Sequence, residues 1–593
     1  MNVNDTDIVR SLLYQDGWTE STVDPTAKHN DDSSAPPTVV LTNTCAIREG
    51  AERKVWQRLQ NLRAQKTKTR NLNKKHKLKS NHYHQQQRTH QIVGVLGCMA
   101  ERLQADLLQE GLADVVVGPD AYRDLPRLLN QQLEMLQEST ANRTAFSDSS
   151  SDPYAAAMNV ELSLDETYAD ITPIRSPSTI SNLPDVSAFV SIQRGCSNRC
   201  SFCIVPFTRG QERSRPLQSI LDEVRQLHFE QGVKEVTLLG QNVNSYHDTS
   251  DDARAAQPES PYRMSNTGFR SRIRRQDAGY FFADLLEQVS DLSSELRVRF
   301  TSPHPKDYPP ELLHLMAERP NICNHLHMPA QSGSTSVLKR MKRGYSRDAY
   351  LELMNTVRDI LPDVALSSDF IAGFCDETEE EHKDTLSLLE QVRYDQAFLF
   401  AYSMRGKTHA HRTMQDNVPE DVKQRRLREL IDTFQHHVHQ KNVDQEIGRL
   451  RLVLVEGQSK RSQDMWSGRT DQNKRILFPV DGVDDNILCR SDECFQLYQQ
   501  DDVPLRSEAW RQQVLQAGDY AVVQVTEAKG HTLRGKLLCR TTLTNFGRSG
   551  LSGVDGASLE RADRFKKWFH EVEGTVLPLS DNSPAKVLKR QML

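Results

Sequence analysis

Six short apolar segments alternate with helical stretches between residues 185 and 440, and this alternation restricts the fold more than any other feature of the sequence. The six candidate strands are Ala188–Ile192, Glu235–Leu239, Arg297–Thr301, His325–Met328, Ala365–Phe370 and Phe398–Ala401. Strands that alternate with helices pair in parallel. Six such units predict a central partial TIM-type (β/α)6 barrel over residues 185–440. In that architecture the reactive groups lie at the carboxyl ends of the strands.

Two further blocks flank this core, and together the three predict an α/β protein. Residues 1–135 predict a small, mostly parallel α/β domain, with helices at 5–15, 49–64 and 100–110 and strands at 38–42, 92–96 and 114–117. Residues 446–543 predict a small β-barrel, because four short apolar runs are separated by turn residues, at 450–455, 475–480, 520–525 and 533–538.

Four stretches contain too few apolar residues to order themselves around a core. They are an insertion at 65–91, a linker at 136–184, an insertion at 248–277, and a tail at 546–593 with a short helix near 558–571. Residues 65–91 carry eight Lys or Arg and no acid. This insertion either touches a polyanion such as RNA or is a solvated loop, and we favour the loop.

Charge and cysteine content exclude several classes of protein. The 593 residues include 75 Lys and Arg against 80 Asp and Glu, a net charge of −5, so any nucleic-acid contact needs a local basic patch. No apolar run is long enough to span a membrane. Residues 1–17 show neither a secretory signal nor a transit-peptide pattern. Ten cysteines are too few for a disulfide scaffold and indicate metal-binding thiols in a reducing compartment.

The strongest chemical signal is the run Cys196-x3-Cys200-x2-Cys203, directly after the first barrel strand. Thiolates are the ligands of iron–sulfur clusters. Three of them hold three corners of a four-iron cluster and leave the fourth iron open to a small molecule. A structural zinc site is the weaker alternative, because zinc takes four ligands and no fourth is close in sequence. Cys323 and Cys375 lack ligand spacing, and we interpret them as ordinary thiols.

This triplet at the start of a partial barrel resembles the radical S-adenosylmethionine enzymes, and the rest of the core resembles their MiaB-type tRNA methylthiotransferase branch. The segments that carry the resemblance are 194–210, 238–246, 299–305, 327–334 and 367–374. The resemblance implies a [4Fe–4S] cluster on the triplet and S-adenosylmethionine on its open iron. Seven polar residues at strand ends are candidates to bind the cofactor or the substrate adenine, with loop or strand capping as the alternative for each: Gln241, Asn242, Ser302, His304, Gln331, Ser332 and Asp369. We assign no catalytic residue beyond the cluster ligands.

Two cysteines of the first block, Cys45 and Cys98, each follow a predicted parallel strand and precede a helix. Helix N-termini favour the thiolate. The resemblance implies a second [4Fe–4S] cluster, the sulfur source, held by three cysteines of this domain. The sequence matches the family from Met1 onward, so the first family cysteine falls two residues earlier and the third ligand is absent here. We expect a late start codon or a lost exon, with a variant that has an incomplete second cluster as the alternative.

The third block resembles a TRAM domain, which grips RNA. Its candidate phosphate contacts, with a solvated β face as the alternative, are Lys460, Arg461, Arg469, Lys474 and Arg475, with Arg534 and Lys536 as possible additions.

The resemblance as a whole implies conversion of N6-isopentenyladenosine at tRNA position 37 to its 2-methylthio form. Segments 43–48, 205–210 and 240–245 are similar to this branch. The alternatives are the threonylcarbamoyladenosine branch and a non-catalytic RNA-binding relative without the sulfur-donating cluster. The implied partners are the tRNA anticodon stem-loop and a flavodoxin- or ferredoxin-like electron donor. We expect a monomer in the mitochondrion or cytoplasm, with any transit peptide outside the sequence because the N-terminus is incomplete relative to the family.

Overall fold

The computed structural model describes residues 2–21, 39–45, 49–77, 91–141, 157–163, 165–171, 173–174, 186–258, 269, 278–479 and 515–549. The chain forms two compact units, Met1–Phe434 and Gln435–Leu593. No helix among the described residues is both long enough and apolar enough to cross a membrane.

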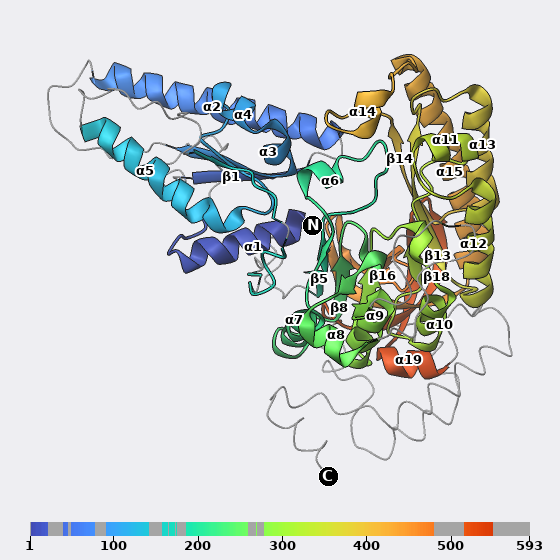
Figure 1. The fold of residues 1–593 in the computed structure, drawn as a ribbon. Helices are drawn as coiled ribbons and strands as arrows, with labels where there is room; N and C mark the ends of the chain where they lie inside the picture. The colour runs from blue at the N-terminus through green and yellow to red at the C-terminus, as the bar shows by residue number, and fades with distance from the viewer. Residues whose placement is uncertain are drawn as a thin grey trace, which may run out of the picture. The chain divides into compact units, whose positions relative to one another are not determined.

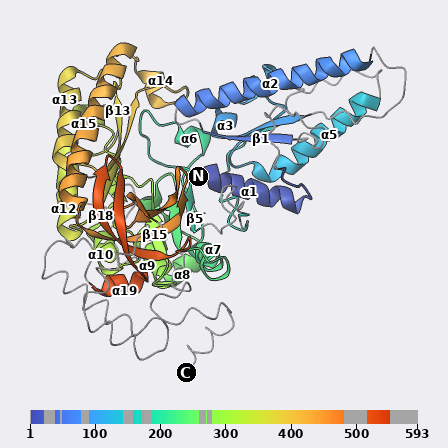
Figure 2. The same ribbon diagram turned by 180° about the vertical axis from the view of Figure 1, so that it is seen from behind.

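The N-terminal part of the first unit is a four-stranded sheet, and all of its strands are parallel. They lie in the order β1 (Val39–Thr44), β2 (Ile92–Gly97), β3 (Val115–Val117) and β4 (Met158–Asn159). Helices cover both faces (Figures 1 and 2): α1 (Asn2–Gln15) and α5 (Leu125–Ala141), preceded by the turn η1 (Tyr122–Asp124), on one, and α2 (Glu49–Lys77), α3 (Cys98–Leu103) and α4 (Ala105–Gln109) on the other.

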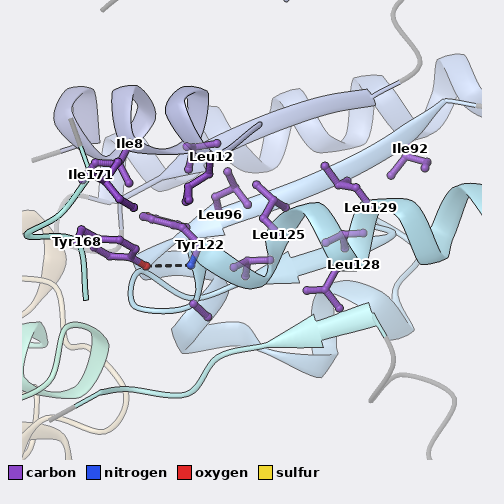
Figure 3. Packing of buried hydrophobic residues seen from close by; sticks show 14 residues of the cluster. Ile8, Leu12, Ile92, Leu96, Tyr122, Leu125, Leu128, Leu129, Tyr168 and Ile171 are labelled. Carbon is purple, nitrogen blue, oxygen red and sulfur yellow. Dashed lines mark hydrogen bonds between the residues drawn. The ribbon is translucent and has the colours of Figure 1, made fainter. Parts of the chain in front are cut away.

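Strand side chains that alternate along β2 and β3 build two separate cores, one on each face of the sheet. Ile92 and Leu96 pack with α1 and α5, as Figure 3 shows. In the same core, the hydroxyl oxygen of Tyr168 accepts a hydrogen bond from the amide of Tyr122 at 2.9 Å. Val93 and Val95 pack on the other face, with α2 and α4. Burial on both faces explains why these strands read as continuous apolar runs in the sequence.

The predicted parallel α/β domain is confirmed, with three corrections. The predicted helix at 100–110 is two helices, because Gln104 has a left-handed φ of 47° between α3 and α4. Helix α2 continues to Lys77, so the first part of the insertion at 65–91 is helical, and residues 78–90 lie outside the described part. The linker at 136–184 supplies the end of α5 and strand β4, whose two-residue pairing leaves no mark on composition.

The six predicted barrel strands are all present in the core of the first unit. They are β5 (Ser187–Ser191), β8 (Glu235–Leu239), β11 (Arg297–Phe300), β12 (His325–His327), β13 (Ala365–Ala372) and β14 (Gln396–Ala401). They form two parallel sheets, β11-β8-β5 and β12-β13-β14. Hydrogen bonds of Val298 with Asn321 (2.8 Å) and Cys323 (2.9 Å) join β11 to the segment that enters β12. The arrangement is therefore a partial barrel of six parallel strands.

Helices alternate with these strands, and two more, α14 (His409–Thr413) and α15 (Glu420–Glu446), follow the last strand. The longer ones are α7 (Leu217–Arg225), α9 (Phe282–Asp291), α10 (Pro310–Glu318), α12 (Arg347–Ile360), α13 (Glu379–Val392) and α15. The shorter elements are β6 (Gln193–Arg194), α6 (Val205–Thr208), β7 (Arg213–Ser214), the π-helical turn η3 (Gln226–Glu230), η4 (Val243–Ser245), η5 (Pro305–Asp307), α11 (Thr335–Arg340) and α14.

The insertion predicted at 248–277 is partly structured. It begins inside β9 (His247–Asp248) and continues through helix α8 (Asp251–Ala256). Strand β9 pairs antiparallel with β10 (Tyr280–Phe281), just after the insertion. Residues 259–268 and 270–277 lie outside the described part.

The second unit contains the predicted small barrel, closed in the order β15-β16-β17-β19-β18. The strands are β15 (Leu450–Ser459), β16 (Ser462–Thr470), β17 (Arg475–Pro479), β18 (Tyr520–Lys529) and β19 (Thr532–Thr541), followed by α19 (Leu543–Ser549). Sequence reasoning missed β16 because it has few apolar residues. A Cβ at Gly468 would lie 2.6 Å from the Leu454 carbonyl oxygen, so glycine lets β16 approach β15. The predicted tail helix at 558–571 lies outside the described residues.

Candidate active site

The cysteine loop lies where the first barrel strand ends, as the sequence predicts. It follows β5 and the short strand β6, and its backbone is fixed from two sides. The amide of Cys196 donates to the Gly210 carbonyl at 3.3 Å, and the amide of Ser201 donates to the Met341 carbonyl at 3.0 Å. The three thiols are therefore held in one short loop at the carboxyl edge of the barrel.

The thiols interact electrostatically with one another. Burial raises the pKa of Cys196, and the neighbouring Cys203 raises it further. Burial likewise raises the pKa of Cys203, and Cys200 adds to the effect. Three thiolates this close need a compensating cation, which an iron–sulfur cluster provides. Among the described residues, no three His, Cys, Asp or Glu side chains are grouped closely enough to hold a single metal ion. A four-iron cluster does not need such a group, because each thiolate would bind a different iron. The donor set fits the cluster.

Arg343, which sequence reasoning missed, contacts the thiol loop. Its Nη1 donates to Sγ of Cys200 at 3.3 Å, its Nη2 donates to the Pro329 carbonyl at 2.7 Å, and its Nε donates to the Tyr345 hydroxyl at 3.0 Å. The guanidinium is buried. Arg343 follows α11 and is 143 residues from Cys200 in the chain, so no local sequence pattern could have predicted this contact.

Gln241 and Asn242 lie in the loop after β8, where their backbone amides both donate to the side-chain oxygen of Gln193 at 3.1 Å. Asn242 also donates from Nδ2 to the Ser245 hydroxyl at 2.7 Å. Within the described structure the side-chain oxygens of both residues are buried without a hydrogen-bond donor. Burial raises the pKa of nearby Glu212, although hydrogen bonds with Ser245 and Asn242 act in the opposite direction. Sequence reasoning missed Glu212.

Ser302 and His304 follow β11. Ser302 has a φ of 64°, a left-handed conformation that costs free energy for a residue other than glycine and often marks a functional loop. His304 is buried, and burial together with the positive charges of Arg343 and Lys306 lowers its pKa well below the usual value. Its Nδ1 accepts the amide of Lys306 at 3.2 Å. The imidazole is therefore neutral at physiological pH.

Gln331 and Ser332 follow β12, and Asp369 lies within β13. Gln331 also has a left-handed φ, of 71°. The hydroxyl of Ser332 lies 3.3 Å from that of Thr385 and accepts the amide of Ser334, which favours a loop-stabilising role. Asp369 lies 3.4 Å from Nε2 of His327. Six of the seven polar candidates thus follow the carboxyl ends of barrel strands, whereas Asp369 lies inside β13. Their contacts to a ligand stay a prediction.

The two N-terminal thiols share one sheet edge, as the sequence predicts. Cys45 directly follows β1 and Cys98 opens α3, and the register pairs Thr44 with Gly97. Cys98 is buried, and its Sγ accepts a hydrogen bond from Nε of Arg209, a core residue, at 3.2 Å. Arg209 also pairs with the buried Asp5 of α1. Burial opposes ionisation of Asp5, yet Arg209 and Arg194 together hold its pKa below the usual value.

The basic candidates of the second unit divide into two groups. Lys460, Arg461 and Arg475 are exposed, and Arg469 pairs with Glu456 at 2.9 Å. Lys474 is placed differently, because it is buried and its ammonium contacts Asn442 (2.8 Å) and Glu446 (2.9 Å). The buried carboxylate of Glu446 also accepts two hydrogen bonds from Arg451, each at 2.8 Å, so Lys474 is part of a buried ion-pair network. We therefore correct the prediction for Lys474, which is an internal ion-pair residue rather than a phosphate contact.

Two family models match the first unit. The radical SAM superfamily matches residues 190–389, and the uncharacterized protein family UPF0004 matches residues 1–118. The two matched ranges include the cysteine triplet and the N-terminal sheet edge, respectively.

Curated relatives match most of the chain. A CDK5RAP1-like protein of Oryza sativa subsp. japonica is 47% identical, over 92% of this chain and 81% of its own length. The mitochondrial tRNA methylthiotransferase CDK5RAP1 of Homo sapiens is 45% identical, over 92% and 80%. The tRNA-2-methylthio-N(6)-dimethylallyladenosine synthase of Chloroherpeton thalassium is 40% identical, over 91% and 94%.

Solved structures are more distantly similar, and one of them serves as an example. The radical S-adenosylmethionine methyltransferase TsrM from Kitasatospora setae is 15% identical, over 68% of this chain and 70% of its own, with a TM-score of 0.40. A similarity this low carries no conclusion about the site.

Proposed function

This chain belongs to the radical S-adenosylmethionine tRNA methylthiotransferases, and from this premise we propose that it converts N6-isopentenyladenosine at tRNA position 37 to its 2-methylthio derivative. The observation that carries the proposal is the position of Cys196, Cys200 and Cys203 in one loop at the carboxyl edge of the barrel. A relative named tRNA-2-methylthio-N(6)-dimethylallyladenosine synthase is 40% identical over 91% of the chain. A relative named mitochondrial tRNA methylthiotransferase is 45% identical over 92% of the chain.

Cys196, Cys200 and Cys203 would hold the [4Fe–4S] cluster that the radical SAM family implies. When bound, the cluster and S-adenosylmethionine supply the hydrogen-abstracting radical that the unactivated C2–H bond of adenine requires. Arg343 keeps the Cys200 sulfur in place through its hydrogen bond. The buried side-chain oxygens of Gln241 and Asn242 are suited to accept N–H groups of a bound ligand.

Cys45 and Cys98 would contribute two ligands to a second [4Fe–4S] cluster, the source of the inserted sulfur. Support comes from their common sheet edge and from the match of this region to the second family model. Two thiolates do not complete the ligand set of such a cluster, which would need at least one further ligand. An incomplete second cluster remains the basis of the alternative, a non-catalytic RNA-binding relative.

The partners follow from the reaction. The substrate would be the anticodon stem-loop of tRNA, and a flavodoxin- or ferredoxin-like protein would supply electrons to a monomeric enzyme. The human relative is named as a mitochondrial protein, so we propose the mitochondrion as the compartment.

Mass spectrometry of tRNA nucleosides from cells that lack the protein tests the reaction. The expected result is loss of 2-methylthio-N6-isopentenyladenosine and accumulation of N6-isopentenyladenosine. Loss of the 2-methylthio-threonylcarbamoyl nucleoside instead would assign the chain to the other branch. Unchanged levels of both nucleosides would favour the non-catalytic alternative.

Reversing two exposed charges of the second unit should weaken tRNA binding. In the variant Lys460→Glu with Arg461→Glu, both side chains lie in the turn between β15 and β16, where they are exposed. The association constant for tRNA should fall at least about tenfold. A plot of its logarithm against the logarithm of the salt concentration should become less steep, because fewer neutralised phosphates release fewer counterions. Filter binding or fluorescence anisotropy measures both quantities.

The matched control for this experiment is Lys529→Glu. Lys529 is exposed on β18 and already pairs with Glu527 at 2.8 Å. The variant Lys529→Glu should leave the affinity for tRNA within about twofold of the wild type, because a surface residue outside the binding site has a small effect. Equal losses in the control and the double variant would show that overall charge, rather than this turn, determines binding.

A further inference from the structure

The segment from Arg209 to Arg213 contacts both groups of thiols. The guanidinium of Arg209 donates from Nε to Sγ of Cys98 at 3.2 Å. The carbonyl of the next residue, Gly210, accepts the amide of Cys196 at 3.3 Å. One peptide unit therefore separates the contact to the N-terminal thiol from the contact to the triplet.

The guanidinium of Arg209 is held by a buried carboxylate. Its Nη2 donates to Oδ2 of Asp5, which is fully buried and also lies 3.1 Å from Nη1 of Arg194. Arg209 itself is 4% exposed. Removing one member of such a buried ion pair leaves its partner charged in a low-dielectric environment and is strongly destabilising locally. Asp5 therefore restricts Arg209 to an orientation in which Nε faces the sulfur.

The other end of the segment is also attached to the N-terminal domain. Arg213 donates from Nη2 to Asp120, which follows β3, at 3.0 Å, and from Nη1 to the carbonyls of Ser163 (3.0 Å) and Asp165 (3.1 Å). Between the two arginines, the amide of Glu212 donates to the Ser197 hydroxyl of the cysteine loop at 3.3 Å. The segment is thus fixed to the sheet at both ends and to the triplet loop in its middle.

We propose that Arg209 is a positioning residue that holds Cys98, and with it the N-terminal sulfur site, in register with the radical-generating triplet. Asp5 orients its guanidinium. Lysine cannot replace it, because a single ammonium on a flexible stem cannot contact the sulfur and the carboxylate with the fixed geometry of the guanidinium fork. The inference rests on the proposed function, because only that function requires the two thiol sites to act together.

Thiol alkylation of the full-length, cluster-free chain tests the contact without any need for activity. Each cysteine is followed by mass spectrometry after timed, anaerobic exposure to iodoacetamide. In Arg209→Gln and in Asp5→Asn, Cys98 should react at least about tenfold faster than in the wild type, because a charged hydrogen bond no longer closes the site. Cys323, which is 2% exposed and lies on the barrel, serves as the internal reference and should be unchanged.

The matched control variant is Arg127→Gln. Arg127 makes an exposed ion pair with Asp124 at 2.6 Å at the start of α5, in the same domain. It should leave Cys98 at the wild-type rate. A wild-type rate for Cys98 in Arg209→Gln would overturn the proposal. Should that variant also expose Cys323 through general unfolding, Arg209→Lys decides: faster alkylation of Cys98 alone supports the proposal, and an unchanged rate overturns it.

The reconstituted enzyme gives a second readout. Arg209→Gln should raise the ratio of 5′-deoxyadenosine to methylthiolated nucleoside at least about tenfold, since the triplet keeps its own ligands while sulfur delivery is misaligned. Parallel losses of both products would count against a positioning role. A wild-type enzyme that forms no methylthiolated nucleoside would refute the proposed function, whereas the alkylation result would still decide the contact between Arg209 and Cys98.

Discussion

Replacing Cys200 by alanine is expected to abolish formation of 5′-deoxyadenosine, and with it formation of the methylthiolated nucleoside. The variant removes one of the three thiolates in the loop Cys196–Cys203 and leaves Arg343 without its sulfur acceptor. Two thiolates cannot hold a four-iron cluster in the site, so iron should fall by about four atoms per chain. Anaerobic reconstitution, followed by iron analysis and chromatography of the cleaved cofactor, measures both effects.

The control for Cys200→Ala is Cys323→Ala. Cys323 is a buried thiol of the barrel, 2% exposed, without ligand spacing to the triplet. Its loss should lower stability by about 1 kcal/mol, as for a small buried group, and should preserve iron content and cofactor cleavage. Cofactor cleavage that persists in Cys200→Ala would mean that the triplet does not hold the radical-generating cluster.

Replacing Gly195 by alanine is expected to disrupt the cysteine loop almost as strongly. Gly195 precedes Cys196 and has a left-handed φ of 72°. A Cβ there would lie 1.9 Å from the carbonyl oxygen of Gln211, a backbone atom that cannot yield without moving the whole segment. Left-handed strain of about 1 kcal/mol and overpacking of about 2 kcal/mol or more would add. The free energy of unfolding should fall by about 3 kcal/mol, and reconstituted iron should drop.

Gly232→Ala separates the two causes. Gly232 has nearly the same φ, 74°, but nothing lies within 4 Å of a Cβ built there. It should therefore show the conformational strain alone, about 1 kcal/mol, with iron content unchanged. Chemical denaturation and iron analysis of the two variants together give the comparison. Equal effects would show that the close approach of Gly195 to Gln211 is unimportant for the loop.

Local sequence patterns predicted the strands of the core well. Side chains alternate or run apolar along each strand, so the six barrel strands lie within a few residues of the predicted ranges. The spacing of Cys196, Cys200 and Cys203 is likewise a local property, and the strand–thiol–helix order of Cys45 and Cys98 predicted their common sheet edge. The boundaries that failed, such as the break at Gln104, depend on single backbone angles that composition does not record.

Lys474 illustrates what local reasoning cannot determine. A lysine in a basic stretch reads as a surface charge, but the barrel buries it against Glu446, a residue 28 positions earlier in the chain. A buried ammonium needs a carboxylate partner, and Glu446, which also pairs with Arg451, provides it. Strand β16 is a second example. Its own apolar content is low, but pairing with β15 and β17 stabilises it as a strand.

The sequence by itself determined the strand–helix alternation, the three-part order of the chain and the cysteine spacing, since each depends on residues near one another along the chain. Only the tertiary structure decided which groups from distant segments meet: Arg343 with Cys200, Lys474 with Glu446, and Arg209 with both Asp5 and Cys98. These pairs are separated by 28 to 204 residues. Their contacts arise because burial leaves each charge or thiol dependent on whatever partner the fold brings near, and no local pattern encodes that partner.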